Sequence, residues 1–187
     1  MKRTQERHAF TLIELMTVVV IISMLAAIAV PNFLNAAVRA KVARSLAEQE
    51  LIVWALESYF NDYDTYPTNQ EAGTFAPGDL NRLTTPIPYM SQLPLDIFLA
   101  PADQDKREFI ETARRGSDTY PYVNFLQAQG SRVSLTPYGL RGSVNYVVYG
   151  MGPGFTSFQN PLDAASWAIY SPSNGTISAG SITTFAP

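Results

Sequence analysis

The stretch that decides the fold is FTLIELMTVVVIISMLAAIAVPNF, residues 10–33. The 21 residues from Phe10 to Val30 carry a single charged side chain, Glu14, in an otherwise apolar run. As a helix that rises ~1.5 Å per residue, this run spans about 30 Å, which is the hydrocarbon thickness of a bilayer. The sequence therefore predicts a membrane-spanning helix over residues 10–30.

The helical pattern does not stop at the end of the apolar run. Apolar residues recur at spacings of three, four and seven, which is typical of an amphipathic helix, and predict its continuation over residues 31–63. These positions are Val38, Val42, Leu46, Val53, Leu56, Phe60 and Tyr63. Pro31 interrupts the pattern, and because proline lacks an N–H and clashes with the preceding turn, we expect a kink or local melting there.

Residues 64–187 have the pattern of a small α+β head. Proline and glycine are frequent up to residue 88, with one short helical segment at 79–84, and a better helix follows at 103–115. Three segments have the length and composition of strands: 143–150, 166–171 and 175–185. Asn174 and Gly175 favour a hairpin between the last two. The predicted fold class is α+β, a long N-terminal membrane-spanning helix carrying a small antiparallel sheet.

Composition argues against catalysis in this head. The chain of 187 residues has no cysteine, one histidine (His8) and a formal net charge of −3. Nucleophilic triads and His or Cys metal sites are therefore excluded beyond the first residues, and nothing predicts binding of nucleic acid. Two clusters of acidic residues offer oxygen ligands, but neither has the glycine-containing loop that calcium prefers. Turns and helix caps therefore explain these clusters better. They are Asp62 with Asp64, and Asp103 with Asp105 and Glu108. We expect no enzyme activity, no cofactor and no metal.

Eight aromatic residues are open to two interpretations. They could form a ligand-binding surface, or they could pack in the core and against the sheet, which is the commoner role. They are Tyr120, Tyr122, Tyr146, Tyr149, Phe155, Phe158, Trp167 and Tyr170.

The N-terminus resembles that of type IV pilins and type II secretion pseudopilins. A small residue (Ala9) precedes Phe10, with Glu14 and Pro31 in the same register as in that family. The resemblance implies that residues 1–9 are a leader, which a membrane prepilin peptidase cuts between Ala9 and Phe10 before the new amine of Phe10 is methylated. The family usually has glycine where this chain has Ala9. The resemblance also implies a pilin-like fold, which agrees with the prediction from the residues.

Glu14 and Pro31 each have two interpretations. A carboxylate in the membrane is costly and calls for a partner, which the resemblance implies is the Phe10 amine of a neighbouring subunit; otherwise Glu14 would only favour the helix dipole. Pro31 could let the helix bend so that subunits pack closely, or it could be a proline of the kind membrane helices tolerate. We therefore expect Phe10, Glu14 and Pro31 to take part in assembly.

These features predict a structural subunit of a type II secretion pseudopilus. The alternatives are a type IV pilus subunit, for motility, adhesion or DNA uptake, and a membrane-anchored binding protein that does not assemble, for which the segment would be an uncleaved anchor. The expected partners are prepilin peptidase, further copies of the chain, other pseudopilins and an inner-membrane assembly platform. Lys2, Arg3 and Arg7 favour a cytoplasmic N-terminus, whereas Arg39, Lys41 and Arg44 favour the reverse. Because the leader charges lie closer to the span, we expect a single-pass protein of the inner membrane with a cytoplasmic N-terminus and the head outside, which then enters a filament.

Overall fold

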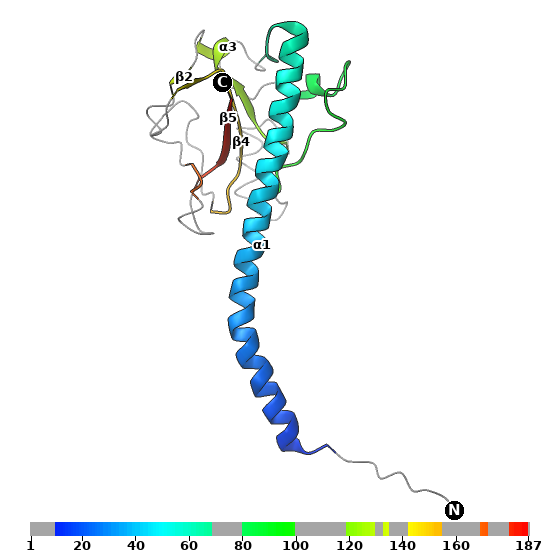
Figure 1. The fold of residues 1–187 in the computed structure, drawn as a ribbon, viewed down its shortest axis with the longest axis vertical. Coiled ribbons are helices and arrows are strands. Elements are labelled where there is room, and N and C mark those ends of the chain that lie inside the picture. Colours follow the sequence, from blue (N-terminus) through cyan, green and yellow to red (C-terminus); the bar gives the residue numbers. More distant parts are fainter. Residues whose placement is uncertain are drawn as a thin grey trace, which may run out of the picture. The chain divides into compact units, whose positions relative to one another are not determined.

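The computed structural model describes residues 10–68, 80–99, 119–129, 133–134, 142–154, 169–171 and 180–186. The chain divides into two compact units, Met1–Val38 and Arg39–Pro187. The helix α1 (Leu12–Tyr63) belongs to both, and the remaining elements belong to the second unit (Figure 1). A long apolar helix and a small antiparallel sheet confirm the predicted α+β, pilin-like fold class.

α1 runs without a break through Pro31. The local melting expected at this proline is therefore wrong. Proline fixes φ near the helical value, so the cost of placing it inside a helix is one missing N–H and crowding in the preceding turn, and the surrounding turns remain helical. At the other end, Asp64 takes a left-handed conformation with φ of 54°, and its N–H donates to the carbonyl of Phe60 at 2.8 Å. This C-terminal turn ends the helix.

The sheet of the second unit has three strands in the order β1-β4-β5, and both pairings are antiparallel. The strands are β1 (Tyr122–Asn124), β4 (Tyr146–Gly150) and β5 (Ile182–Ala186). Tyr122 pairs with Val148, and Tyr146 pairs with Ala186. The smaller elements are the 3-10 helix η1 (Leu80–Leu83), the helix α3 (Phe125–Gln129) and a two-stranded ribbon of β2 (Val133–Ser134) and β3 (Ser143–Val144).

Both faces of this sheet are covered, because every residue of the central strand β4 is buried. Side chains alternate along a strand, so Tyr146 and Val148 lie in a core with Leu56 of α1, whereas Val147 and Tyr149 lie in a second cluster. The second cluster is completed by Val123, Phe125, Val144 and Phe185. The part of α1 in this unit therefore packs on one face of the sheet (Figure 1).

The buried face of α1 differs from the predicted stripe. Val42 and Leu56 are buried as expected, but Leu46 and Tyr63 are 43% and 45% exposed. Two polar residues, Ser45 and Gln49, are fully buried instead. The complete buried set is Val42, Ser45, Gln49, Ile52, Ala55, Leu56 and Tyr59. A search for apolar periodicity misses this face because two of its positions carry polar side chains.

Glycines at the end of β4 permit close approach of neighbouring elements. A Cβ on Gly150 would lie 2.7 Å from the ring of Tyr120 and 3.1 Å from the side-chain nitrogen of Gln49. A Cβ on Gly152 would lie 1.9 Å from the backbone carbonyl oxygen of Gly180, which itself has φ of 147°. Both positions favour glycine, because a Cβ would meet the buried ring of Tyr120 at Gly150 and the backbone of Gly180 at Gly152.

The predicted smaller elements are confirmed in part. The short helix at 79–84 is η1, and the strand segment 143–150 contains β3 and β4. The helix at 103–115 and the turn at Asn174 and Gly175 lie outside the described residues. The antiparallel hairpin between 166–171 and 175–185 is wrong where it can be checked, because Ile169 bridges Ser181 in parallel and β5 pairs with β4. β1 was not predicted, because three residues are too few for a periodicity.

Candidate functional site

The N-terminal end of α1 is closed by a reciprocal pair of hydrogen bonds between Thr11 and Glu14. The backbone N–H and the hydroxyl of Thr11 donate to one carboxylate oxygen of Glu14, at 2.9 and 2.6 Å. The backbone N–H of Glu14 donates in return to the Thr11 hydroxyl oxygen at 3.3 Å. This is a capping box, in which two N–H groups that the first turn leaves unpaired find side-chain acceptors. Thr11 is therefore the N-cap, and Phe10 lies outside the helix.

The capping box was not predicted, because Glu14 was considered only as a charge. Its sequence signal is the spacing Thr-x-x-Glu before an apolar run. The box gives the carboxylate a local partner within its own chain, two residues from the predicted cleavage junction. Glu14 is thus both the end of a helix cap and the charged group of the apolar segment.

The apolar residues of the first unit are exposed. Leu12 and Phe33, near the two ends of the apolar stretch, are each 73% exposed, and the large apolar residues between them are exposed as well. Among the described residues, α1 is the one helix whose length and apolar composition would let it cross a membrane. Such a surface requires lipid or the apolar surface of another chain. Pro31 lies inside this stretch, preceded by Ala26, Ala27 and Ala29.

In the second unit, three carboxylates of α1 accept hydrogen bonds from tyrosines that lie far along the chain. Glu48 accepts from Tyr120 at 2.7 Å. Glu57 accepts from Tyr146 at 2.7 Å and also from Tyr66. Asp62 accepts from Tyr89 at 2.6 Å, so these hydroxyls fix the register of the helix against the rest of the unit.

Gln49 makes the corresponding contact with the sheet. Its amide nitrogen donates to the carbonyl of Ile182 at 2.9 Å, and its amide oxygen accepts from the hydroxyl of Thr184 at 2.9 Å. A buried amide is favourable only when it is paired in this way. Gln49 therefore joins α1 to β5.

Burial raises the pKa of Tyr120, Tyr122 and Tyr146 far above the usual tyrosine range. Desolvation is the largest cause for all three, because an apolar environment penalises the phenolate. The hydrogen bond to Glu57 raises the pKa of Tyr146 further, since a phenolate could not donate to a carboxylate. All three side chains are neutral hydrogen-bond donors at neutral pH.

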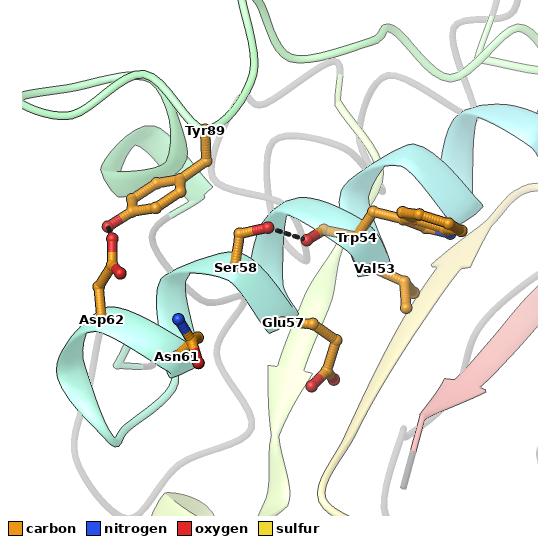
Figure 2. A pocket seen from close by; sticks show the side chains of 7 residues that line it. All are labelled: Val53, Trp54, Glu57, Ser58, Asn61, Asp62 and Tyr89. Carbon is orange, nitrogen blue, oxygen red and sulfur yellow. Dashed lines mark hydrogen bonds between the residues drawn. The ribbon is translucent and has the colours of Figure 1, made fainter.

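A groove of about 540 Å³ lies along the exposed face of the last turns of α1 (Figure 2). Of the described residues that line it, two are carboxylates and none is basic. Tyr89 reaches across one end to Asp62, and Trp54, which is 74% exposed, lies at the other end. The lining is Val53, Trp54, Glu57, Ser58, Asn61, Asp62 and Tyr89. Sequence reasoning missed this groove because Tyr89 comes from a loop.

The other predicted site residues divide clearly. Four of the eight aromatics, Tyr120, Tyr122, Tyr146 and Tyr149, are buried, which supports core packing, and Tyr170 is partly exposed. Phe155, Phe158 and Trp167 lie outside the described residues, as do Ala9 and the carboxylates at 103, 105 and 108. Within the part of the chain that the structure describes, no three potential metal ligands come together.

A known family model matches the N-terminal segment that contains the capping box. The family model for the prokaryotic N-terminal methylation motif matches residues 5–30, which include Phe10 and Glu14. Residues 5–30 therefore carry this motif, in the segment for which the sequence resembles type IV pilins and type II secretion pseudopilins.

The curated proteins that the chain is similar to include type IV pilins and type II secretion core proteins. The chain is 42% identical over 75 residues to the type IV major pilin protein PilA of Myxococcus xanthus, and 41% identical over 71 residues to the type II secretion system core protein G of Pseudomonas aeruginosa. These alignments cover 40% and 38% of this chain, and 34% and 49% of the relatives. The chain thus spans about a third to a half of the length of the curated relatives it matches. No solved structure matches it.

Proposed function

We propose that this chain is a structural subunit of a type II secretion pseudopilus. The observation that carries the proposal is the apolar helix that begins at a methylation motif, with its one carboxylate at Glu14. An exposed apolar surface with one charge suits a subunit that is stored in lipid and then packs against copies of itself. Similarity to core protein G of three bacteria supports the secretion role.

In this proposal, prepilin peptidase removes residues 1–9 by cutting between Ala9 and Phe10, and the new amine of Phe10 is methylated. The mature chain is held in the inner membrane by residues 10–30, with its N-terminus in the cytoplasm and the head outside. Assembly pairs Glu14 with the Phe10 amine of a neighbouring subunit, because any other register leaves a buried charge without an opposite charge beside it. Pro31 and the nearby alanines allow close packing. The role is structural and not catalytic, and it involves other pseudopilins and an inner-membrane platform.

A second candidate is a type IV pilus subunit. It is favoured by the 42% identity to PilA of Myxococcus xanthus and by the 37% identity to the type IV major pilin protein PilE1 of Neisseria gonorrhoeae. Deleting the gene separates the two candidates. Loss of secreted proteins from the medium with surface filaments intact supports the pseudopilin, and loss of surface filaments with normal secretion supports the pilin.

Mass spectrometry of the purified chain tests the processing step. We expect the mature chain to begin at a methylated Phe10. A chain that retains Met1, or that begins elsewhere without a methyl group, would contradict the proposal and would favour a membrane-anchored protein that does not assemble.

The capping box provides a matched pair of variants that separate the charge of Glu14 from its cap. Glutamine can also close a capping box, so Glu14→Gln keeps the helix start and removes only the charge, whereas Glu14→Ala removes both. We expect both variants to be processed, and both to assemble far less than the wild type. Filament yield after shearing or detergent extraction measures this, and wild-type yield from Glu14→Gln would show that the charge has no assembly role.

A further inference from the structure

The groove beside Trp54 is acidic although the same helix is basic one stretch earlier. Glu57 and Asp62 accept hydrogen bonds from neutral tyrosine hydroxyls, and neither forms an ion pair with another of the described residues. In the described residues the one ion pair is Arg44 with Glu48, at 2.7 Å, and the side chain of Arg44 is 64% exposed. The Glu48 side chain is 14% exposed, so the pair is half-buried, but a guanidinium carries five N–H donors and Arg44 can donate to a second carboxylate as well. The groove therefore suits a cationic partner.

The basic part of α1 lies on the same side of the helix as the groove. Arg39 and Glu57 are 18 residues apart, as are Arg44 and Asp62. Because 18 residues make five helical turns of ~3.6 residues, corresponding positions point in the same direction. A flat, exposed alanine face lies between the two arginines. It consists of Ala40, Ala43 and Ala47.

The alanine face matches the groove position by position. A shift of 18 residues brings Ala40 level with Ser58 and Ala43 level with Asn61. Small residues allow two helix backbones to approach closely, so a bulky Trp54 on one helix can lie over the alanines of another.

We propose that the groove of one copy binds the basic segment Arg39–Ala47 of a second copy in the filament, with the helices parallel and staggered by about 18 residues, or ~27 Å. The inference rests on the proposed function and names the partner surface. Since the facing sides of two parallel helices are mirror-related, Arg39 meets Asp62 of the neighbour and Arg44 meets Glu57, as in the flanking pairs of a parallel coiled coil.

Charge also disfavours the alternative in which copies associate in register. Without the stagger, Arg39 and Arg44 of one copy would lie beside the same arginines of the next, and the acidic halves would also face each other. The contact joins two different patches, so it is heterologous and can propagate along an open filament.

Cysteine cross-linking tests the stagger cleanly because the chain has no cysteine of its own. Full-length Ala43→Cys and Asn61→Cys chains are co-expressed with the assembly machinery, and the extracted filaments are oxidised. We expect a disulfide-linked dimer from the mixture and none from either variant alone. Dimers from Ala43→Cys alone would indicate association in register and overturn the proposal, as would no dimer while filaments form.

A charge exchange in this cross-linking background tests the ion pairs. Arg39→Asp and Asp62→Arg should each lower the dimer yield about two- to fivefold, and the two together should restore it. Restoration also shows that Asp62→Arg leaves the head folded. Failure of the double variant to restore the dimer would overturn the pairing. If the wild-type chain is neither processed nor assembled, the proposed function itself fails and this contact falls with it; a processed, assembling wild type without the cross-link removes the contact alone.

Discussion

At the scale of single residues, buried polar groups decide how the helix meets the sheet. Gln49 lies on the buried face of α1 and bonds to both Ile182 and Thr184 of β5. An apolar residue at this position would pack equally well but would leave the carbonyl of Ile182 with one acceptor bond fewer. Specific pairing of this kind selects one register of helix on strand, which a purely apolar face would not.

Replacing Gln49 tests this role. Gln49→Met keeps the volume and removes both hydrogen bonds, so we expect a loss of about 1–3 kcal/mol in the free energy of unfolding. Urea unfolding of the full chain in detergent, followed by near-UV circular dichroism, measures it. Glu50→Gln at the neighbouring exposed position is the control and should stay within about 0.5 kcal/mol of the wild type. Equal stability of the two variants would contradict the role assigned to Gln49.

At the scale of elements, the end of β4 depends on backbone contact. We expect Gly152→Ala to lower the free energy of unfolding by about 3 kcal/mol or more. The new Cβ would collide with the backbone carbonyl of Gly180, and backbone cannot move aside as a flexible side chain can. Gly142→Ala is the matched control. Gly142 has φ of 108° with open space around it, so it should cost only about 1 kcal/mol of backbone strain. Thermal unfolding of both variants tests the difference, and a milder effect at Gly152 would count against the close approach.

The elements also indicate how far sequence reasoning reaches. The long helix, η1 and the strands at β4 and β5 follow from length, periodicity and composition, because each is a local property of the chain. The buried stripe along α1 was predicted only in part, because it includes the polar residues Ser45 and Gln49. The partners of Gln49 on β5 lie more than 130 residues along the chain, so no local pattern signals its burial. The hairpin failed for the same reason: β5 finds its partner in β4 and not in its sequence neighbour.

The candidate site divides in the same way. The assembly roles of Phe10, Glu14 and Pro31 stay predictions that rest on their spacing. The capping box was not predicted, although Thr11 and Glu14 have the spacing that signals one. The groove could not be found, since it needs Tyr89 to fold back over Asp62 from a loop. Its charge complement on Arg39 and Arg44 becomes meaningful only once the groove is known.

At the scale of the whole molecule, the tyrosine contacts make stability dependent on alkaline pH. Tyr120, Tyr122 and Tyr146 have pKa values in the folded state that lie above the value of about 10 for an unfolded chain. Their contribution is therefore fully present below pH ~10 and is lost as the pH rises toward the folded-state values.

We accordingly expect the free energy of unfolding to be flat with respect to these groups between pH 7 and pH 9, and to fall above pH ~10. Urea unfolding at a series of pH values measures the slope, and absorbance at 295 nm follows ionisation of the tyrosines. Tyr146→Phe removes one titrating group and should flatten the alkaline slope while lowering stability at neutral pH. A wild-type slope that begins well below pH 10, or one unchanged in Tyr146→Phe, would argue against these tyrosines as its source.

The capping box at Thr11 has a consequence for the energetics of polymerisation. If Glu14 exchanges its hydrogen bonds to Thr11 for an ion pair with a neighbour's amine on joining the filament, it gives up bonds that it already has. The driving force is then the difference in free energy between these two interactions and not the whole cost of a lone charge in lipid. On the proposed function, a subunit stored in the membrane keeps the Glu14 carboxylate hydrogen-bonded to Thr11 until it assembles. The strength of the Thr11 contact then acts as a setting for the threshold concentration above which subunits leave the reservoir and polymerise.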